Sequence, residues 1–171
     1  DLLGENFDLA VRIGDLPDDA LLAARRIAVL PGGLYAAPAY LAERGDPASP
    51  DDLDQHDSLR LLGRNGEAAG WTLTRGDRKW EGAPPARAVA NAPDLLINLA
   101  RAGAGIAAVP DCFVAPSVRR GELRRVLPDW CMPSHTAWAV FPGRRLMPAK
   151  TRAFIGMLEA ALEGVRGNST E

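Results

Sequence analysis

The sequence has few of the residues from which catalytic and metal sites are usually built. Its 171 residues include only two cysteines and two histidines. Cys112 and Cys131 form no Cys-x-x-Cys pair, and His135 has no second ligand at metal-binding spacing. His56 follows a helix-like segment and is expected to cap the end of that helix. With no Gly-x-Ser-x-Gly elbow and no Walker loop either, we expect a protein that is not an enzyme and needs no metal or cofactor.

Long apolar runs and an excess of positive charge are missing too. No apolar stretch approaches the ~20 residues of a membrane helix, and the first residues, DLLGENFD, lack the basic region and apolar core of a signal peptide. The formal net charge of -2 disfavours a free-standing nucleic-acid-binding domain. Arginine pairs at 25–26, 119–120, 124–125 and 144–145 are expected to be solvated faces and ion pairs. Isolated cysteines without a leader favour a reducing compartment, so we expect a cytoplasmic protein with no membrane partner.

The spacing of apolar residues alternates between that of strands and that of helices. Residues 7–13 (FDLAVRI) have period two and predict a strand. Pro31 and the Gly32-Gly33 pair argue against one continuous strand in the next apolar stretch, so a strand is expected only over 33–37, before a short helix from Pro38. Further strands are predicted at 59–63, 70–76, 87–90, 105–110, 123–127 and 136–141, and further helices from residues 50, 93, 113 and 148. This alternation predicts an α/β chain, with 105–110 buried on both faces of a sheet.

One helix start offers a place for a small anion. The helix from Pro93 directly follows the strand at 87–90, so its free backbone N–H groups lie at the carboxyl end of a strand. Asn91 either adds a side-chain donor there or merely caps the helix. The glycines of RAGAGIAAV follow a helix and precede a strand, which is the reverse of the dinucleotide-binding order, so they indicate a helix end.

Five long segments together resemble one protein family. They are FDLAVRIGDLPDDALLAARRI, LYAAPAYLAERGDPASPDDLDQHDSL, ARAGAGIAAVPDCFVAP, GELRRVLPDW and AVFPGRRLMPAKTRAFIGML. In order and spacing they are similar to the effector-binding domain of LysR-type transcriptional regulators, from Leu2 to about Leu162. The resemblance implies a type 2 periplasmic-binding-protein-like fold, in which two α/β lobes are joined by two crossing strands and a small effector binds in the cleft between them.

On this template, residues 1–36 and 138–171 form lobe one, and residues 37–137 form lobe two. Lobe one is expected to be incomplete, since the family's domain normally begins with a strand, a helix and a strand before FDLAVRIG. The chain would then be N-terminally truncated, without the winged helix-turn-helix through which the family binds DNA. An unpaired position beside the strand at 7–13 invites another chain, so either a homo-oligomer is expected, a dimer or tetramer in the parent protein, or marginal stability.

The resemblance also implies which residues line the effector site, where a small anionic metabolite is expected. Arg12 either points into the cleft or forms a structural ion pair with a nearby Asp. Relatives often have NNG or NDG where this chain has NAP, which removes a polar side chain and one N–H at Ala92 and Pro93. The expected site residues are Arg12, Gly14, Tyr35, Ala36, Ala37, Pro38, Asn91, Ala92, Pro93, Asp94, Val109, Pro110 and Asp111.

Three alternatives stay open at this point. A solute-binding protein of a transport system shares the fold, but it would need a leader and export. An enzyme could be built on two such lobes, but it would need a paired acid and base or a covalent cofactor site. The chain could also be a remnant with no activity of its own. The sensing domain of a LysR-type regulator fits the residues best.

Overall fold

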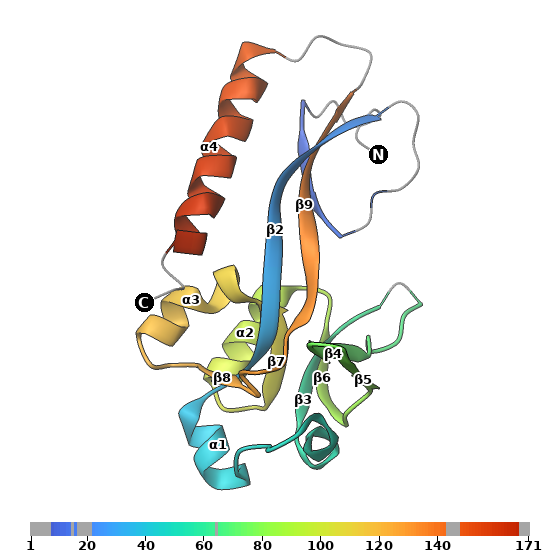
Figure 1. The fold of residues 1–171 in the computed structure, drawn as a ribbon, viewed down its shortest axis with the longest axis vertical. Helices are drawn as coiled ribbons and strands as arrows, with labels where there is room; N and C mark the ends of the chain where they lie inside the picture. Colours follow the sequence, from blue (N-terminus) through green and yellow to red (C-terminus); the bar gives the residue numbers. More distant parts are fainter. Residues whose placement is uncertain (1–7, 15, 17–21, 64, 143–147, 168–171) are drawn as a thin grey trace. The chain divides into compact units, whose positions relative to one another are not determined.

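The computed structural model describes residues 8–14, 16, 22–63, 65–142 and 148–167. The chain divides into two compact units, unit one with residues 1–30 and 134–171, and unit two with residues 31–133. Both divisions fall inside long strands, β2 (Leu22–Ala36) and β9 (Met132–Pro142) (Figure 1). The lobe limits expected from the sequence lie a few residues further along the chain and stay a prediction.

Unit one is an antiparallel sheet with a helix packed on it. β1 (Ala10–Ile13) pairs antiparallel with β9, and β9 lies next to β2. α4 (Ala149–Gly167) buries Ile155 against Ile27 and Ala139. Among the described strands β1 is the end strand of the sheet, as the sequence predicts, while Phe7 lies outside the described residues.

Unit two is a mixed sheet with helices and a hairpin. Its strands follow the order β2, β7 (Ile106–Pro110), β3 (Ser58–Leu61) and β6 (Ala86–Ala90), and β8 (Arg124–Val126) also pairs with β2. β7 is antiparallel to β2 and parallel to β3, and β3 is parallel to β6. The helices are α1 (Pro38–Arg44), the 3-10 helix η1 (Pro50–Gln55), α2 (Pro93–Arg101) and α3 (Asp111–Arg119). The separate hairpin consists of β4 (Trp71–Arg75) and β5 (Arg78–Gly82), of which β5 is not among the expected strands.

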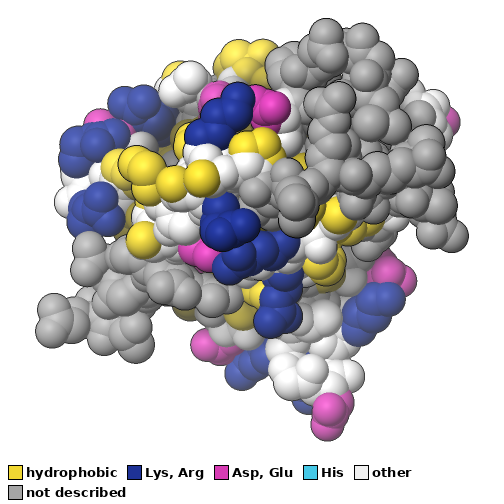
Figure 2. Space-filling model, turned by 90° about the horizontal axis from the view of Figure 1, so that it is seen from above, with side chains coloured by type: hydrophobic (Ala, Val, Ile, Leu, Met, Phe, Trp, Pro, Cys, Tyr) yellow, Lys and Arg dark blue, Asp and Glu magenta, His cyan; other side chains and the backbone are white. Residues whose placement is uncertain are grey.

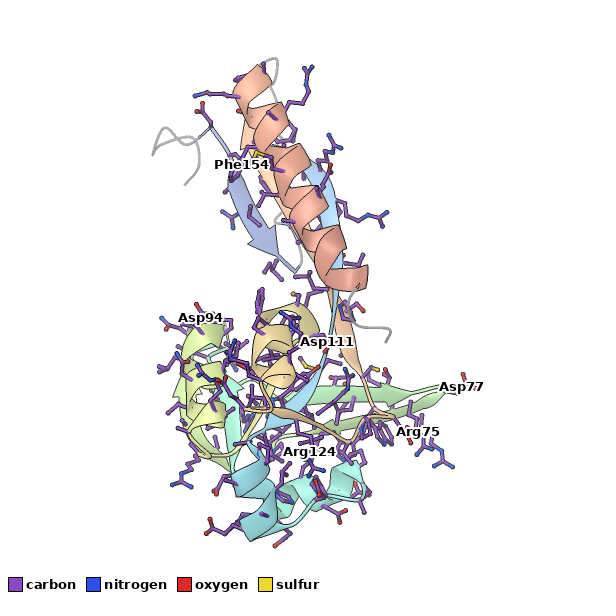
Figure 3. The ribbon with its side chains drawn as sticks, turned by 90° about the vertical axis from the view of Figure 1, so that its left-hand side faces the viewer. Arg75, Asp77, Asp94, Asp111, Arg124 and Phe154 are labelled. Carbon is purple, nitrogen blue, oxygen red and sulfur yellow. The ribbon has the colours of Figure 1, made fainter. Side chains whose placement is uncertain are left out.

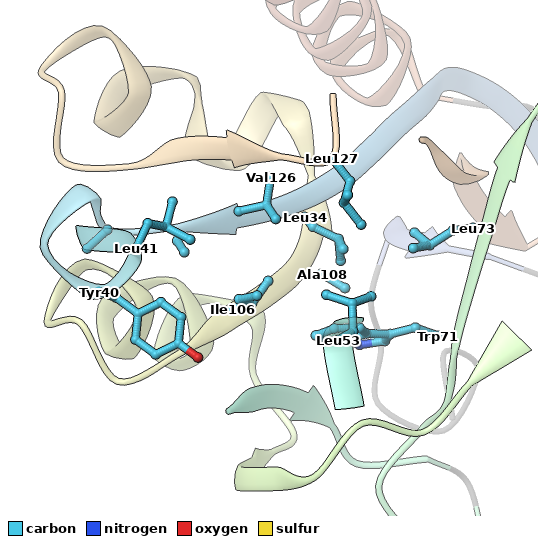
Figure 4. Close-up of a cluster of buried hydrophobic side chains, with 12 residues drawn as sticks. Leu34, Tyr40, Leu41, Leu53, Trp71, Leu73, Ile106, Ala108, Val126 and Leu127 are labelled. Atoms are coloured by element: carbon cyan, nitrogen blue, oxygen red, sulfur yellow. The ribbon is translucent and has the colours of Figure 1, made fainter. Parts of the chain in front are cut away.

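Alternating residues of β2 and β7 enter two different hydrophobic clusters. Leu34 and Ile106 pack with Leu53 and Leu73 in one cluster (Figure 4), whereas Val109 packs with residues such as Leu59, Leu96 and Ile97 in the other. Because successive side chains of a strand point to opposite faces, a strand that feeds both clusters is buried on both sides. The predicted burial of 105–110 on both faces is therefore confirmed for β7.

The expected break at Pro31 and Gly32-Gly33 is wrong, because β2 runs through all three residues. An extended backbone fits the fixed φ of proline, and Pro31 directly precedes the segment that pairs with β7. A Cβ on Gly32 would lie 2.9 Å from the carbonyl oxygen of Val109, and one on Gly33 would lie 2.7 Å from Cζ of Arg125. The two glycines therefore permit close approach to their neighbours and do not end the strand.

Within unit two, the buried Arg60 of β3 binds carbonyl groups of two later segments. Arg60 is 7% exposed, and its guanidinium donates to the carbonyl oxygens of Ala69, Pro84 and Ala68 at 2.9, 3.0 and 2.7 Å. No carboxylate of the described residues pairs with it. Since a buried cation is tolerated only when its donors are satisfied, these three carbonyl groups are what keep Arg60 inside.

Candidate functional site

Three polar side chains of unit two meet above Gly33. Tyr35 donates its hydroxyl hydrogen to Oδ1 of Asp111 at 2.8 Å, and Nη1 of Arg125 lies 3.1 Å from Oδ2 of the same carboxylate. Nη1 also lies 3.3 Å from the Tyr35 hydroxyl oxygen, and the guanidinium is 5.8 Å from the centre of the tyrosine ring. We name Tyr35, Asp111 and Arg125 the polar cluster. It joins two residues of the predicted site, Tyr35 and Asp111, to Arg125, which is not in the predicted set.

The sheet register brings the polar cluster together. Arg125 on β8 is the pairing partner of Tyr35 on β2, and Gly33 lies two residues before Tyr35, on the same face of β2. Asp111 comes directly after β7, the other neighbour of β2, and is the first residue of α3 (Figure 3). Its carboxylate therefore lies at the start of a helix, near free backbone N–H groups.

The guanidinium of Arg125 makes few short hydrogen bonds, although neighbouring groups surround it. Its Nε is buried and has no hydrogen-bond partner. Its Nη2 has only long contacts, 3.5 Å to the carbonyl oxygens of Gly32 and Trp130 and 3.6 Å to Sγ of Cys131. An arginine that faces a carboxylate usually forms two parallel hydrogen bonds. Here only Nη1 reaches the carboxylate of Asp111, so the donor capacity of Arg125 is incompletely used.

The surroundings of the polar cluster raise the pKa of two of its members, Tyr35 and Arg125. Burial, and after it the hydrogen bond to Asp111, raises the pKa of Tyr35 well above that of a free phenol, so its hydroxyl stays protonated and acts as a donor. Burial by itself lowers the pKa of Arg125, but the nearby Tyr35 and Asp111 outweigh it and raise that pKa overall. The cluster therefore presents a neutral hydroxyl and a permanent cation to one carboxylate.

Arg125 is the residue of the polar cluster that is absent from the predicted site. The expectation that the arginine pairs are solvated faces and ion pairs holds for Arg25, Arg120 and Arg124, which are exposed and pair with Glu159, Glu122 and Asp46. Arg125 also forms an ion pair, with Asp111, but it is not on a solvated face, since its side chain is only 26% exposed. A strand over LRRVL puts consecutive residues on opposite faces, so one arginine of this pair had to face inward. The pair at 144–145 lies outside the described residues.

The start of α2 is a weaker candidate than the sequence suggests. Ala92 occupies the N-cap position and makes no side-chain cap, so Asn91 does not cap the helix. Asn91 is exposed after β6, and Pro93 provides no N–H. Asp94 lies in the first turn of α2, where its carboxylate already faces the positive helix end (Figure 3). These four residues adjoin one another in sequence, and nothing beyond the helix start gathers donors around them among the described contacts.

Two of the predicted residues lie in unit one. Gly14 has a φ of +94°, which suits glycine, and its N–H donates to the carbonyl oxygen of Thr136 at 2.9 Å. The indole N–H of Trp138 donates to the carbonyl oxygen of Gly14 at 3.1 Å. Arg12 is exposed opposite Trp138, and no described carboxylate pairs with it. A shallow hollow of about 190 Å³ lies beside this turn, lined by Gly14, Leu16, Ser134, His135, Thr136 and Trp138.

The remaining predicted residues have structural surroundings of their own. Ala36, Ala37 and Val109 are buried in the hydrophobic clusters, Pro38 opens α1, and Pro110 ends β7. Of the whole predicted set, the structure joins Tyr35 and Asp111 directly.

Basic, acidic and apolar side chains are mixed on the described surface. On the face shown in Figure 2, lysine and arginine side chains are dispersed among acidic and apolar ones. Within the described residues, no group of three histidine, cysteine or acidic side chains is arranged to hold a metal ion. None of the described helices combines the length and the apolar character needed to cross a membrane.

A mixed α/β chain with one large sheet divided between two units has the architecture of the type 2 periplasmic-binding-protein-like domains. Within that class, the chain belongs to the LysR substrate binding domain family, the effector-binding domain of LysR-type transcriptional regulators, whose family model matches residues 1–163. The expected fold class and family are thereby confirmed.

Curated relatives carry the names of transcriptional regulators. An HTH-type transcriptional regulator of Xanthomonas campestris is 37% identical over 165 residues, which cover 95% of this chain and 48% of the relative. The HTH-type transcriptional regulator PtxR of Pseudomonas aeruginosa is 36% identical over 167 residues, which cover 95% of this chain and 51% of PtxR. The chain thus spans about half the length of the curated relatives it matches.

Solved structures of regulatory domains share the fold. The regulatory domain of CrgA from Neisseria meningitidis, a LysR-type transcriptional regulator, matches with a TM-score of 0.80 and 26% identity, covering 94% of this chain and 78% of that one. The regulatory domain of AphB from Vibrio vulnificus matches with a TM-score of 0.73 and 26% identity, covering 92% of this chain and 76% of that one.

Proposed function

We propose that this domain senses a small anionic metabolite on behalf of a LysR-type regulator. The polar cluster is the observation that carries the proposal. It combines a protonated hydroxyl with an incompletely bonded guanidinium, 26% exposed, and both already face a carboxylate. Donors of this kind, fixed by a sheet register, favour anions over neutral or cationic solutes.

In the parent protein we propose that the bound metabolite alters the conformation of a DNA-bound homo-oligomer in the cytoplasm. The effector would bind in the cleft between two lobes, as the family implies, with the remaining predicted residues of both lobes contributing. DNA would be contacted through a helix-turn-helix outside this chain, since the curated relatives are named for one. A ligand changes such an equilibrium only through different affinities for the two conformations.

The alternative of a solute-binding protein for transport is not favoured. The curated relatives reported above are named as regulators of transcription, and none is named as a transport protein or an enzyme. The family likeness therefore supports a sensor domain of a transcriptional regulator.

A thermal-shift screen tests the proposed function. The whole chain would be heated with small carboxylates, phosphates and sulfonates, and with neutral and cationic analogues of similar size, all at one ionic strength set with sodium chloride. A ligand that binds only the folded protein adds about 4 kcal/mol of stability at a thousand times its Kd, so at least one anion should raise the Tm by several degrees. Stabilisation by neutral or cationic compounds alone would contradict the proposal.

A further inference from the structure

We propose that Arg125 is the residue that anchors a carboxylate group of the ligand, and that Asp111 occupies this anchor until the ligand displaces it. This inference rests on the proposed function and assigns the ligand's chemical class and the residue that recognises it. Four features of the polar cluster support it.

The first feature is that the polar cluster already binds a carboxylate, that of Asp111, through one hydrogen bond to each oxygen. Each oxygen of Asp111 has one strong partner, the Tyr35 hydroxyl at 2.8 Å for Oδ1 and Nη1 of Arg125 at 3.1 Å for Oδ2. A carboxylate from a small molecule would receive the same two hydrogen bonds in the same place. The receptor geometry for the guest is therefore present before the guest arrives.

The second feature is that Asp111 accepts only one of the hydrogen bonds that the guanidinium of Arg125 could donate. A carboxylate that is free to move can meet a guanidinium side-on and accept two parallel hydrogen bonds. Asp111 is tethered to the start of α3 and accepts only one from Arg125. The other close contacts of the guanidinium are 3.3 to 3.6 Å long, and its Nε has no acceptor at all. Because Nε is buried, a diffusible carboxylate gains over Asp111 through Nη1 and Nη2, which it can meet side-on.

The third feature is that the anchor is both rigid and reachable. The guanidinium lies on the bare backbone of Gly33, where a Cβ would be 2.7 Å from Cζ, and it lies beside the Tyr35 ring. The side chains of Arg125 and Asp111 are 26% and 27% exposed, so water and a small solute reach the pair from outside. A cation fixed in this way keeps its donors aimed without losing much entropy on binding.

The fourth feature is where Asp111 would go. Asp111 begins α3, while its two partners belong to β2 and β8. Displacement by a ligand would release the Asp111 side chain from both strands, while the backbone of the preceding residue, Pro110, stays paired with Gly32 of β2. The ligand would then bind the arrangement in which Asp111 is displaced and not the one in which Asp111 occupies Arg125. A sensor requires such a difference in affinity between two arrangements.

The test is a titration of the whole 171-residue chain with acetate as probe, with chloride holding the ionic strength constant. The readout is the side-chain Nε–Hε resonance of Arg125 in ¹H–¹⁵N spectra, identified by its loss in Arg125→Met. We expect this resonance to shift saturably with acetate. Tyr35→Phe should weaken acetate binding several-fold, because one donor is lost while the ring remains.

The decisive variant is Asp111→Asn, which removes the competing charge but keeps the shape of the side chain. It should bind acetate roughly fivefold more tightly, the factor by which a partly exposed ion pair holds its partner. Arg124→Met is the matched control, since Arg124 is the neighbouring exposed arginine that pairs with Asp46 (Figure 3). This control should leave acetate binding unchanged.

Two results would overturn the anchor. One is acetate affinity in Asp111→Asn that equals or falls below that of the original chain. The other is an Arg125→Met variant that binds acetate as well as the original chain does. If Asp111→Asn does not fold, Tyr35→Phe decides, and unchanged affinity there rejects the proposed receptor. An anion that stabilises Arg125→Met as strongly as the original chain would leave the sensing function standing and remove only Arg125 from it.

Discussion

Replacing Gly32 or Gly33 by alanine should have very different effects, although the two residues are neighbours in β2. A Cβ on Gly32 would lie 2.9 Å from the Val109 carbonyl oxygen and 3.3 Å from Cα of Pro110. Both are backbone atoms of the paired strand β7, and ordinary contact at 3.4 Å would require the oxygen to retreat by about 0.5 Å and the Cα by about 0.1 Å. Overpacking that displaces backbone costs about 1–3 kcal/mol, so Gly32→Ala should lower the free energy of unfolding by about 2 kcal/mol.

At Gly33 the atoms in the way belong to a side chain. A Cβ there would lie 2.7 to 3.0 Å from the guanidinium of Arg125, which can rotate away. The loss is then the ion pair with Asp111, worth roughly 1 kcal/mol for a partly exposed pair. Alanine regains roughly 0.5–1 kcal/mol over glycine within a strand, so Gly33→Ala should be close to neutral for stability.

Urea unfolding followed by tryptophan fluorescence measures both variants, because Trp71, Trp80 and Trp130 all belong to unit two. A loss of about 2 kcal/mol for Gly32→Ala is a roughly thirtyfold change in the ratio of folded to unfolded protein. Gly33→Ala should instead move the Nε–Hε resonance of Arg125 while the unfolding midpoint stays. Equal destabilisation by the two variants would refute the idea that Gly33 serves only as a platform for Arg125.

Three further predictions concern other parts of the chain. Gly156→Ala in α4 should raise the free energy of unfolding, measured in urea, by about 1 kcal/mol, because its Cβ would meet nothing within 4 Å and alanine is the better helix former. A loss of stability would contradict the open space around Gly156. Arg60→Met should lower the free energy of unfolding by roughly 3 kcal/mol, about 1 kcal/mol for each of three carbonyl acceptors left without a donor, and a change below 1 kcal/mol would mean that water replaces them. Burial, followed by the charge of Arg44, lowers the pKa of His56, whose Nδ1 lies 3.2 Å from the Tyr40 hydroxyl oxygen. The folded state therefore disfavours protonated His56, so stability should fall as the pH drops below about 6.5 towards the lower folded pKa; His56→Gln should flatten this part of the profile, and an unchanged slope would count against the assignment.

Much of the fold follows from local sequence signals. The helices from Pro38, Pro50 and Pro93 begin where proline at the first helical position predicts, although the second of them is a 3-10 helix. Glycine after α2 ends that helix, and the short apolar run 105–110 forms the strand that is buried on both faces. Such signals depend only on neighbours along the chain, which is why they can be read without a structure.

The errors occur where distant segments decide the outcome. Gly32 and Gly33 look like a strand break in isolation, but they are continuous strand because β7 and Arg125 press against them from segments about 75 and 90 residues further on. β5 is missed because its residues RKWEG are mostly polar and exposed, and its strand geometry comes from pairing with β4. Sheet pairing overrides local propensity in both cases.

The candidate site divides in the same way. The sequence by itself determined the family and the α/β class, and it named Tyr35 and Asp111. Long colinear segments and the spacing of apolar residues are properties of the order along the chain, so they need no tertiary structure. Only the tertiary structure decided that the carboxylate of Asp111 contacts both the hydroxyl of Tyr35 and the guanidinium of Arg125. That meeting depends on the register of β8 against β2 and on the place where β7 ends. A hydrogen bond acts over about 3 Å, so which donors reach one carboxylate is fixed by packing between strands and cannot be read from their order along the chain.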